Sequence, residues 1–124
     1  MQQLYFHPAW EKTISDQDRA LIEDLFEQTY NQVDDLIMSP VIQVALNHKK
    51  ELLVTVLVHN FTHHSARFNN RSVFIHCDDF DAEQVFTIPD LVIAPVTSMP
   101  WTFIFEANPV YEKLQLNELV LEIE

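Results

Sequence analysis

Three histidines lie within six residues of one another, and their chemistry is the easiest to name. His59, His63 and His64 carry imidazole nitrogens, which bind zinc when three or four donors converge inside a fixed surrounding shell. The spacing of His59 and His63 would place both rings on one face of a helix, but this segment has the pattern of a strand followed by a loop. Two interpretations stay open: a small ligand- or metal-binding β-sandwich that uses this cluster, and solvated loop histidines.

Other reactive side chains also lie at short spacing, without the surroundings that catalysis requires. Asp79, Asp81 and Glu83 alternate as calcium ligands do, but the chain has 0 glycines and the sharp turn of a calcium loop needs one. Cys77 follows His76, which puts the two side chains on opposite faces of a strand, so we expect a buried structural thiol. The lack of glycine also excludes the serine nucleophile elbow and phosphate-binding loops. We therefore predict no enzyme, with no catalytic residue, metal or cofactor.

The size and charge of the chain restrict its architecture and its partners. At 124 residues it should form a single domain over residues 1–124 with a sizeable core. A formal charge of −12 argues against a nucleic acid or an anionic membrane surface and favours a basic protein patch. The single cysteine fits a reducing compartment, and there is neither a secretory signal nor the ~20 apolar residues of a membrane span. We expect a cytoplasmic protein without membrane insertion.

The first third of the chain should contain an irregular segment followed by one helix. Residues 4–12 form an aromatic lead-in, and its Tyr5, Phe6 and Trp10 either pack back onto the body or form a docking surface. Ser15 is a good N-cap, and apolar residues then recur at helical spacing, which predicts an amphipathic helix over about residues 15–33. Pro40 ends any further helix. The other face of this helix is acidic.

From Val41 onward the apolar period changes to two. Val41–Leu46 and Glu51–His59 should form a hairpin, with Asn47 in the left-handed conformation that glycine would otherwise take. Further strands are expected at residues 67–77 with a bulge at Asn69-Asn70, 83–88, 91–94 after an interruption at Pro89, 99–106 and 114–124. The predicted fold is mainly β: an N-terminal amphipathic helix followed by an antiparallel immunoglobulin-like β-sandwich over about residues 41–124.

The strand over residues 99–106 should be central to the core. Its alternation sends Trp101, Phe103 and Phe105 to one face, which is a large apolar load for one strand. We expect these three rings to be buried against the second strand of the hairpin.

Four segments resemble one protein family. His7–Lys12 (HPAWEK) is similar to the opening of the SLAP domain, and Pro100–Phe105 (PWTFIF) is similar to its closing motif. Val54–Asn60 and Phe86–Leu91 resemble the strands between them. This domain occurs in accessory Sec system S-layer assembly proteins of Gram-positive bacteria, and the resemblance covers nearly the whole chain. It implies a role in accessory Sec-dependent export or assembly of surface proteins, and it assigns no catalytic residue.

Together, charge and resemblance predict a cytoplasmic protein-interaction module. The surface expected to bind the partner combines the acidic helix face, the aromatic lead-in and a free strand edge; its residues are Trp10, Asp16, Glu23, Asp24 and Glu27. The alternative for the helix face is that its charge only confers solubility.

Overall fold

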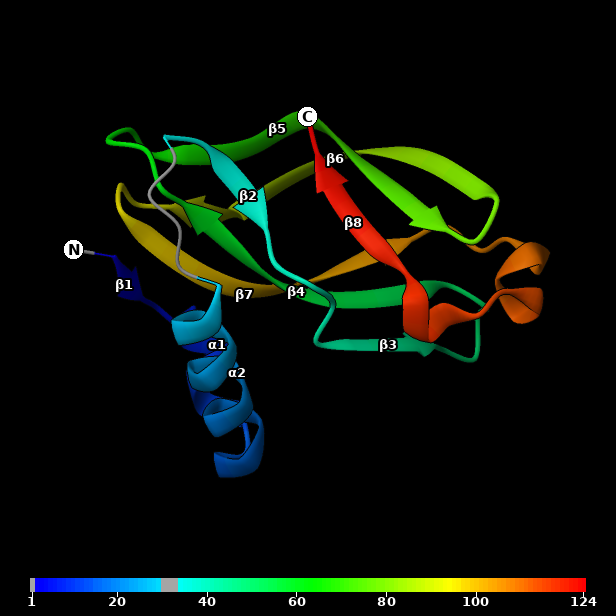
Figure 1. The fold of residues 1–124 in the computed structure, drawn as a ribbon, viewed down its shortest axis with the longest axis horizontal. Coiled ribbons are helices and arrows are strands. Elements are labelled where there is room, and N and C mark those ends of the chain that lie inside the picture. Colours follow the sequence, from blue (N-terminus) through cyan, green and yellow to red (C-terminus); the bar gives the residue numbers. More distant parts are fainter. Residues whose placement is uncertain (1, 30–33) are drawn as a thin grey trace.

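The computed structural model describes residues 2–29 and 34–124, which form two β-sheets with a helical layer at the N-terminal end (Figure 1). The elements are β1 (Gln3–Leu4), α1 (Pro8–Thr13), α2 (Asp16–Gln28), β2 (Leu36–Met38), β3 (Gln43–Leu46), β4 (Leu52–Asn60), β5 (Ala66–Cys77), β6 (Phe80–Ile93), β7 (Thr97–Phe105), the 3-10 helices η1 (Pro109–Lys113) and η2 (Leu116–Glu118), and β8 (Val120–Ile123). The chain is therefore mainly β, as its period-two segments predict.

Strand β4 is the centre of the first sheet. It pairs with β7 along its whole length on one side, while β3 and β2 pair with its first and last parts on the other side. Strand β1 adds to the far edge of β7 and is parallel to it. The second sheet has the order β6-β5-β8, and all its pairs are antiparallel. The sheets are thus antiparallel except at β1.

The core lies between the two sheets. Phe103 of β7 packs its ring against Phe68 of β5 and Phe86 of β6, with centroids 5.4 and 5.3 Å apart. The predicted burial of Phe103 and Phe105 is confirmed, since both are almost fully inaccessible. The prediction for Trp101 is wrong in degree, because this ring is only half-buried and meets the His7 ring edge-on at 5.6 Å. Strand β1 covers β7 only as far as Ser98, which leaves Trp101 at an uncovered edge.

The N-terminal segment is more regular than its sequence indicates. The lead-in, predicted to be irregular, contains β1 and α1; Pro8 begins α1, where its missing N–H costs nothing, and the backbone N–H of Ala9 donates to His7 Nδ1. Helix α2 has the expected cap, since Ser15 Oγ accepts from the backbone N–H of Asp18 at 3.0 Å. It ends at Gln28, and residues 30–33 of the predicted helix lie outside the described residues.

Three strand predictions need correction. The sequence predicts only a connector over residues 31–39, but this segment contains β2, which is too short to show a period of its own. The interruption predicted at Pro89 is not observed, and strand β6 continues through it. Because β6 is an edge strand, a residue without a backbone N–H is tolerated there. The last strand is only β8, since two 3-10 helices occupy residues 109–113 and 116–118.

The turns use left-handed residues other than glycine. Positive φ values occur at Lys50 (66°), Asn70 (53°), Asp78 (54°) and Val96 (54°) among the described residues. The bulge predicted at Asn69-Asn70 is confirmed by the register shift that follows Phe68. In the β3–β4 turn the prediction of a left-handed Asn47 is wrong, and Lys50 takes that role. Instead, Asn47 Oδ1 accepts from the backbone N–H groups of Lys49 and Glu51.

Candidate functional site

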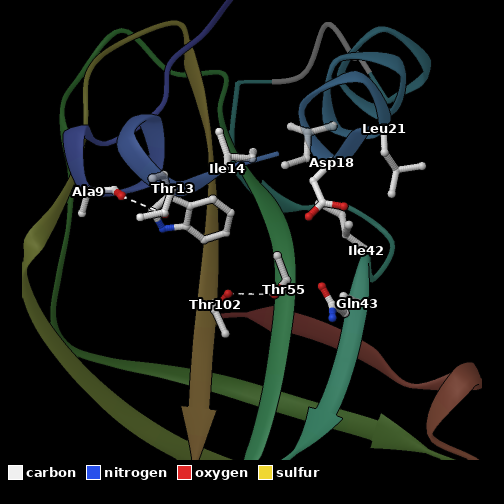
Figure 2. A pocket seen from close by; sticks show the side chains of 11 residues that line it. Ala9, Thr13, Ile14, Asp18, Leu21, Ile42, Gln43, Thr55 and Thr102 are labelled. Carbon is white, nitrogen blue, oxygen red and sulfur yellow. Dashed lines mark hydrogen bonds between the residues drawn. The ribbon is translucent and has the colours of Figure 1, made fainter. Parts of the chain in front are cut away.

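A groove of about 680 Å³ separates the helical layer from the outer face of the first sheet (Figure 2). Its walls come from α1, α2 and the segment that leads into β3, and its floor comes from β4 and β7. The lining residues are Ala9, Trp10, Thr13, Ile14, Asp18, Leu21, Ile22, Ile42, Gln43, Thr55 and Thr102. Segments from five parts of the sequence therefore form one concave surface.

Small side chains on the sheet leave room for this groove. Thr55 and Thr102 are direct neighbours across β4 and β7, and their Oγ1 atoms are 2.7 Å apart and hydrogen-bonded (Figure 2). On the helical side, Thr13 Oγ1 donates to the Ala9 carbonyl within α1 (3.1 Å). Because these hydroxyls are hydrogen-bonded within the protein, the groove surface presents fewer free hydrogen-bonding groups than its residue types indicate.

A second groove continues the first along α2. It is lined by Leu21, Asp24, Leu25, Gln28, Val41 and Ile42, so that Leu21 and Ile42 belong to both. We call the two together the paired groove. Leu21 is 54% exposed, and the charged residues among those that line the paired groove are Asp18 and Asp24. The paired groove is thus apolar in its middle and negative along its helical wall.

The structure divides the predicted partner-binding residues. Trp10 and Asp24 both line the paired groove. Glu23 instead lines a separate groove beside the N-terminal segment, and Asp16 and Glu27 are exposed on α2. Of the five residues that the sequence predicts to bind the partner, the structure therefore places two in the paired groove.

Sequence reasoning also missed several lining residues. Ile14 and Ile42 come from connecting segments, which have no period of their own. Asp18, Leu21 and Leu25 follow one another at intervals of three and four residues, so they share one side of α2. That spacing is a signal which could have indicated an apolar stripe with an acidic end.

The histidine cluster does not form a metal site. His59 is buried in β4, where its Nδ1 lies 2.6 Å from Ser98 Oγ and its Nε2 lies 2.8 Å from Thr29 Oγ1. Burial lowers the pKa of His59 to about 4. His63 and His64 are exposed on the following loop. In residues 2–29 and 34–124 no group of three His, Cys, Asp or Glu side chains could hold a metal ion.

His59 is instead part of a buried network that joins four segments. Ser98 Oγ, which contacts His59, also accepts from Gln2 Nε2 at 3.0 Å, and the same Gln2 group donates to the Asn60 carbonyl. The Phe61 ring stacks on the imidazole at 4.9 Å. The network therefore ties the start of the chain and the end of α2 to β4 and β7.

The remaining candidates for chemistry have structural partners. The Cys77 thiol is buried and donates to the Gln115 carbonyl, and burial, with Asp78 and Glu118 nearby, raises the pKa of this thiol. In the acidic run, Asp81 hydrogen-bonds His76 at 2.6 Å, and Glu83 accepts from Ser72 Oγ at 2.6 Å. A buried structural thiol is confirmed, and two of the alternating carboxylates, Asp81 and Glu83, are hydrogen-bonded to side chains of β5.

Comparison with known proteins gives one match. A family model described as the SLAP domain matches residues 4–123. No curated protein and no solved structure matches the chain.

Proposed function

The chain belongs to the SLAP domain family, and from this membership we propose that it is a non-catalytic protein-interaction module that assists accessory Sec-dependent export or assembly of surface proteins of the S-layer type. The observation that carries the proposal is the family match, which extends over residues 4–123.

The state of the buried polar groups supports a binding role over a catalytic one. In the described part of the chain, every buried side-chain nitrogen or oxygen atom has a hydrogen-bond partner. Catalysis needs a group whose pKa is shifted and whose reactive atom can reach a substrate. The pKa of His59 is strongly lowered, but both of its ring nitrogens are hydrogen-bonded, one to Ser98 and the other to Thr29. We propose no catalytic residue and no cofactor.

The charge supports a protein partner with a basic surface. With a net charge of −12, the chain would attract a cationic partner and speed their encounter, and added salt would weaken this effect. The same charge repels nucleic acid and anionic lipid. No helix in the described residues has both the length and the apolar content to cross a membrane. Action in the cytoplasm, where clients of a secretion route are still accessible, is part of the proposal.

For the fold, we propose the immunoglobulin-like type of sandwich. The support is that two sheets of mostly antiparallel strands share one core, in which β5 and β6 rings pack on β7. Superposition of an experimental structure on immunoglobulin domains would test this type directly.

The function is tested in the bacterium that carries the gene. Deletion should lower the amount of at least one surface protein exported by the accessory route, and the wild-type gene should restore it. A tagged wild-type chain, crosslinked in cells, should enrich a component or client of that route. An unchanged surface proteome, with no such protein enriched, would show that the proposed function is wrong.

A further inference from the structure

We infer that the paired groove receives a short extended segment of a protein partner, in which apolar side chains accompany two Lys or Arg side chains. The inference rests on the proposed function and deepens it, because it names the surface and the partner chemistry of that interaction.

The apolar part of the segment is indicated by the middle of the paired groove. A single exposed leucine is common on a protein surface. Leu21 differs because it is shared by two adjoining grooves whose walls also include Ile14, Ile42 and Val41. Because Leu21 is 54% exposed within these grooves, an apolar side chain of a partner can pack against it.

The cationic part is indicated by the carboxylates. Asp18 lines the first part of the paired groove and Asp24 lines the second, and among the residues that the structure describes no cationic residue lines either part. In the described residues neither carboxylate forms an ion pair, whereas Glu11 on α1 is paired with Arg19 at 2.8 Å. Two unpaired negative charges beside an apolar surface are complementary to Lys or Arg side chains next to apolar ones.

An extended conformation is indicated by the neighbouring strand. Among the described strands, β3 pairs with β4 alone, so its other edge has no strand partner. Gln43, the first residue of β3, lines the groove, and a segment lying there could add to this edge through backbone hydrogen bonds. The wall of α2 from Asp18 to Gln28 is about 15 Å long. An extended chain of about five residues has the same length.

A second copy of the chain is a poorer occupant than a cationic segment. Each copy carries a net charge of −12, so two copies would bring like charges together at a wall that is already negative. The negative wall would repel an acidic peptide for the same reason.

The test starts from a random library of ten-residue peptides displayed on phage and selected on the whole chain. We expect the selected peptides to be enriched in Lys or Arg together with apolar residues. Synthetic copies should bind more weakly as salt is raised. The amide resonances that they shift in NMR spectra should belong to α2 and to residues 41–43.

Variants then assign the binding to the paired groove. Leu21→Glu should weaken the binding of the selected peptides about tenfold or more, because it replaces an apolar contact with an unpaired charge. The double variant Asp18→Asn with Asp24→Asn should weaken peptide binding severalfold, and its affinity should change less with salt concentration than that of the wild type. The controls are Val85→Glu, which changes a β6 side chain of equal 54% exposure on the other sheet, and Asp16→Asn, which removes a charge from the same helix. Both should bind as the wild type does, with all variants checked for unchanged melting.

The outcomes separate this inference from the proposed function. It is overturned if the library yields no binder, if the binders are acidic, or if Leu21→Glu and Val85→Glu bind alike. A dimer in sedimentation that Leu21→Glu abolishes would also overturn it, because a second copy would then be the occupant. If the secretion-route protein is enriched equally by wild type and Leu21→Glu, the proposed function stands and the groove assignment is wrong. If the groove binds basic peptides but deletion leaves export unchanged, the groove assignment stands and the proposed function is wrong.

Discussion

The Nε2 atom of His59 lies 2.8 Å from Oγ1 of Thr29, and this contact joins the central strand to the C-terminal end of α2. On its other side, Nδ1 of the same ring lies 2.6 Å from Ser98 Oγ. The helix that forms one wall of the paired groove is thus attached to the sheet through one buried imidazole.

The stability of the protein should depend on pH through this imidazole. The folded pKa of His59 is about 4, below the ordinary value of 6.5, so the unfolded chain binds a proton in this window that the folded chain does not. The stabilising contribution is therefore complete above pH 6.5 and decreases as the pH falls to about 4. Between pH 7 and 4 the free energy of unfolding should fall by on the order of 3 kcal/mol more for the wild type than for His59→Gln. Urea unfolding at several pH values measures this, and parallel pH profiles of the two proteins would contradict it.

Asn60 should be sensitive to the smallest possible change of side chain. Its Nδ2 group donates to the carbonyls of His64 (2.7 Å), Ile93 (3.0 Å) and Ala94 (3.1 Å), and the residue is fully buried. Asn60→Asp would replace this donor with an oxygen that faces three acceptors. We expect a loss of about 3 kcal/mol or more in the free energy of unfolding. Asn117→Asp, at an exposed position, is the control, and equal urea midpoints for the two variants would disprove the role of Asn60.

The core of the sandwich should depend on Phe103 more than on Trp101. Phe103 is fully buried between Phe68 and Phe86, so Phe103→Ala should cost about 3–5 kcal/mol through lost transfer energy and a cavity. Trp101→Ala should cost less, because that ring is half-buried at an open edge. Ile104→Ala, on the opposite face of the same strand, should change stability by only about 0.5 kcal/mol. Denaturant unfolding that ranks these variants differently would show that the strand is placed incorrectly.

His76 should titrate at higher pH than an ordinary histidine. The hydrogen bond to Asp81 is the main reason that its pKa is raised, and a bond to Glu122 adds to this effect against partial desolvation. Because the folded pKa is raised, these contacts stabilise the fold below the ordinary pKa and weaken as the pH rises through the folded value. In NMR titrations, Asp81→Asn should lower the pKa of His76 more than Glu122→Gln does. A wild-type value at or below that of the Asp81→Asn variant would contradict the assignment.

Much of the fold follows from local pattern. The apolar pattern predicts two buried strands, at Glu51–His59 and at residues 99–106, because each pattern extends over eight or nine residues. The structure has β4 and β7 there and pairs Val54 with Phe103. Ser15 predicts the start of α2 because an N-cap is a local hydrogen bond. Short elements are different, because α1 and β2 hold too few residues for a period. Strand β2 exists through its pairing with β4, which lies further along the chain.

The candidate site could be predicted only in part, for the same reason. Trp10 and Asp24 were expected at a binding surface from their chemistry, but their relation to Ile42 and Thr102 depends on how α1 and α2 lie on the sheet. His59 was assigned to a possible metal cluster because its neighbours in sequence are histidines. Its actual partners, Thr29 and Ser98, lie 30 and 39 residues away, where no local spacing indicates them.

The left-handed conformation of Val96 has an evolutionary consequence. A β-branched side chain at a φ of 54° is strained, and hydrogen bonds from the Val96 N–H to the Thr62 carbonyl and from the Gln3 N–H to the Val96 carbonyl hold it there. Glycine at this position would keep both hydrogen bonds and relieve about 1 kcal/mol of strain. Glycine would also lose the partly buried Val96 side chain and make the unfolded chain more flexible, so the relief of strain is offset. A chain with 0 glycines can therefore keep a strained valine here without a large loss of stability.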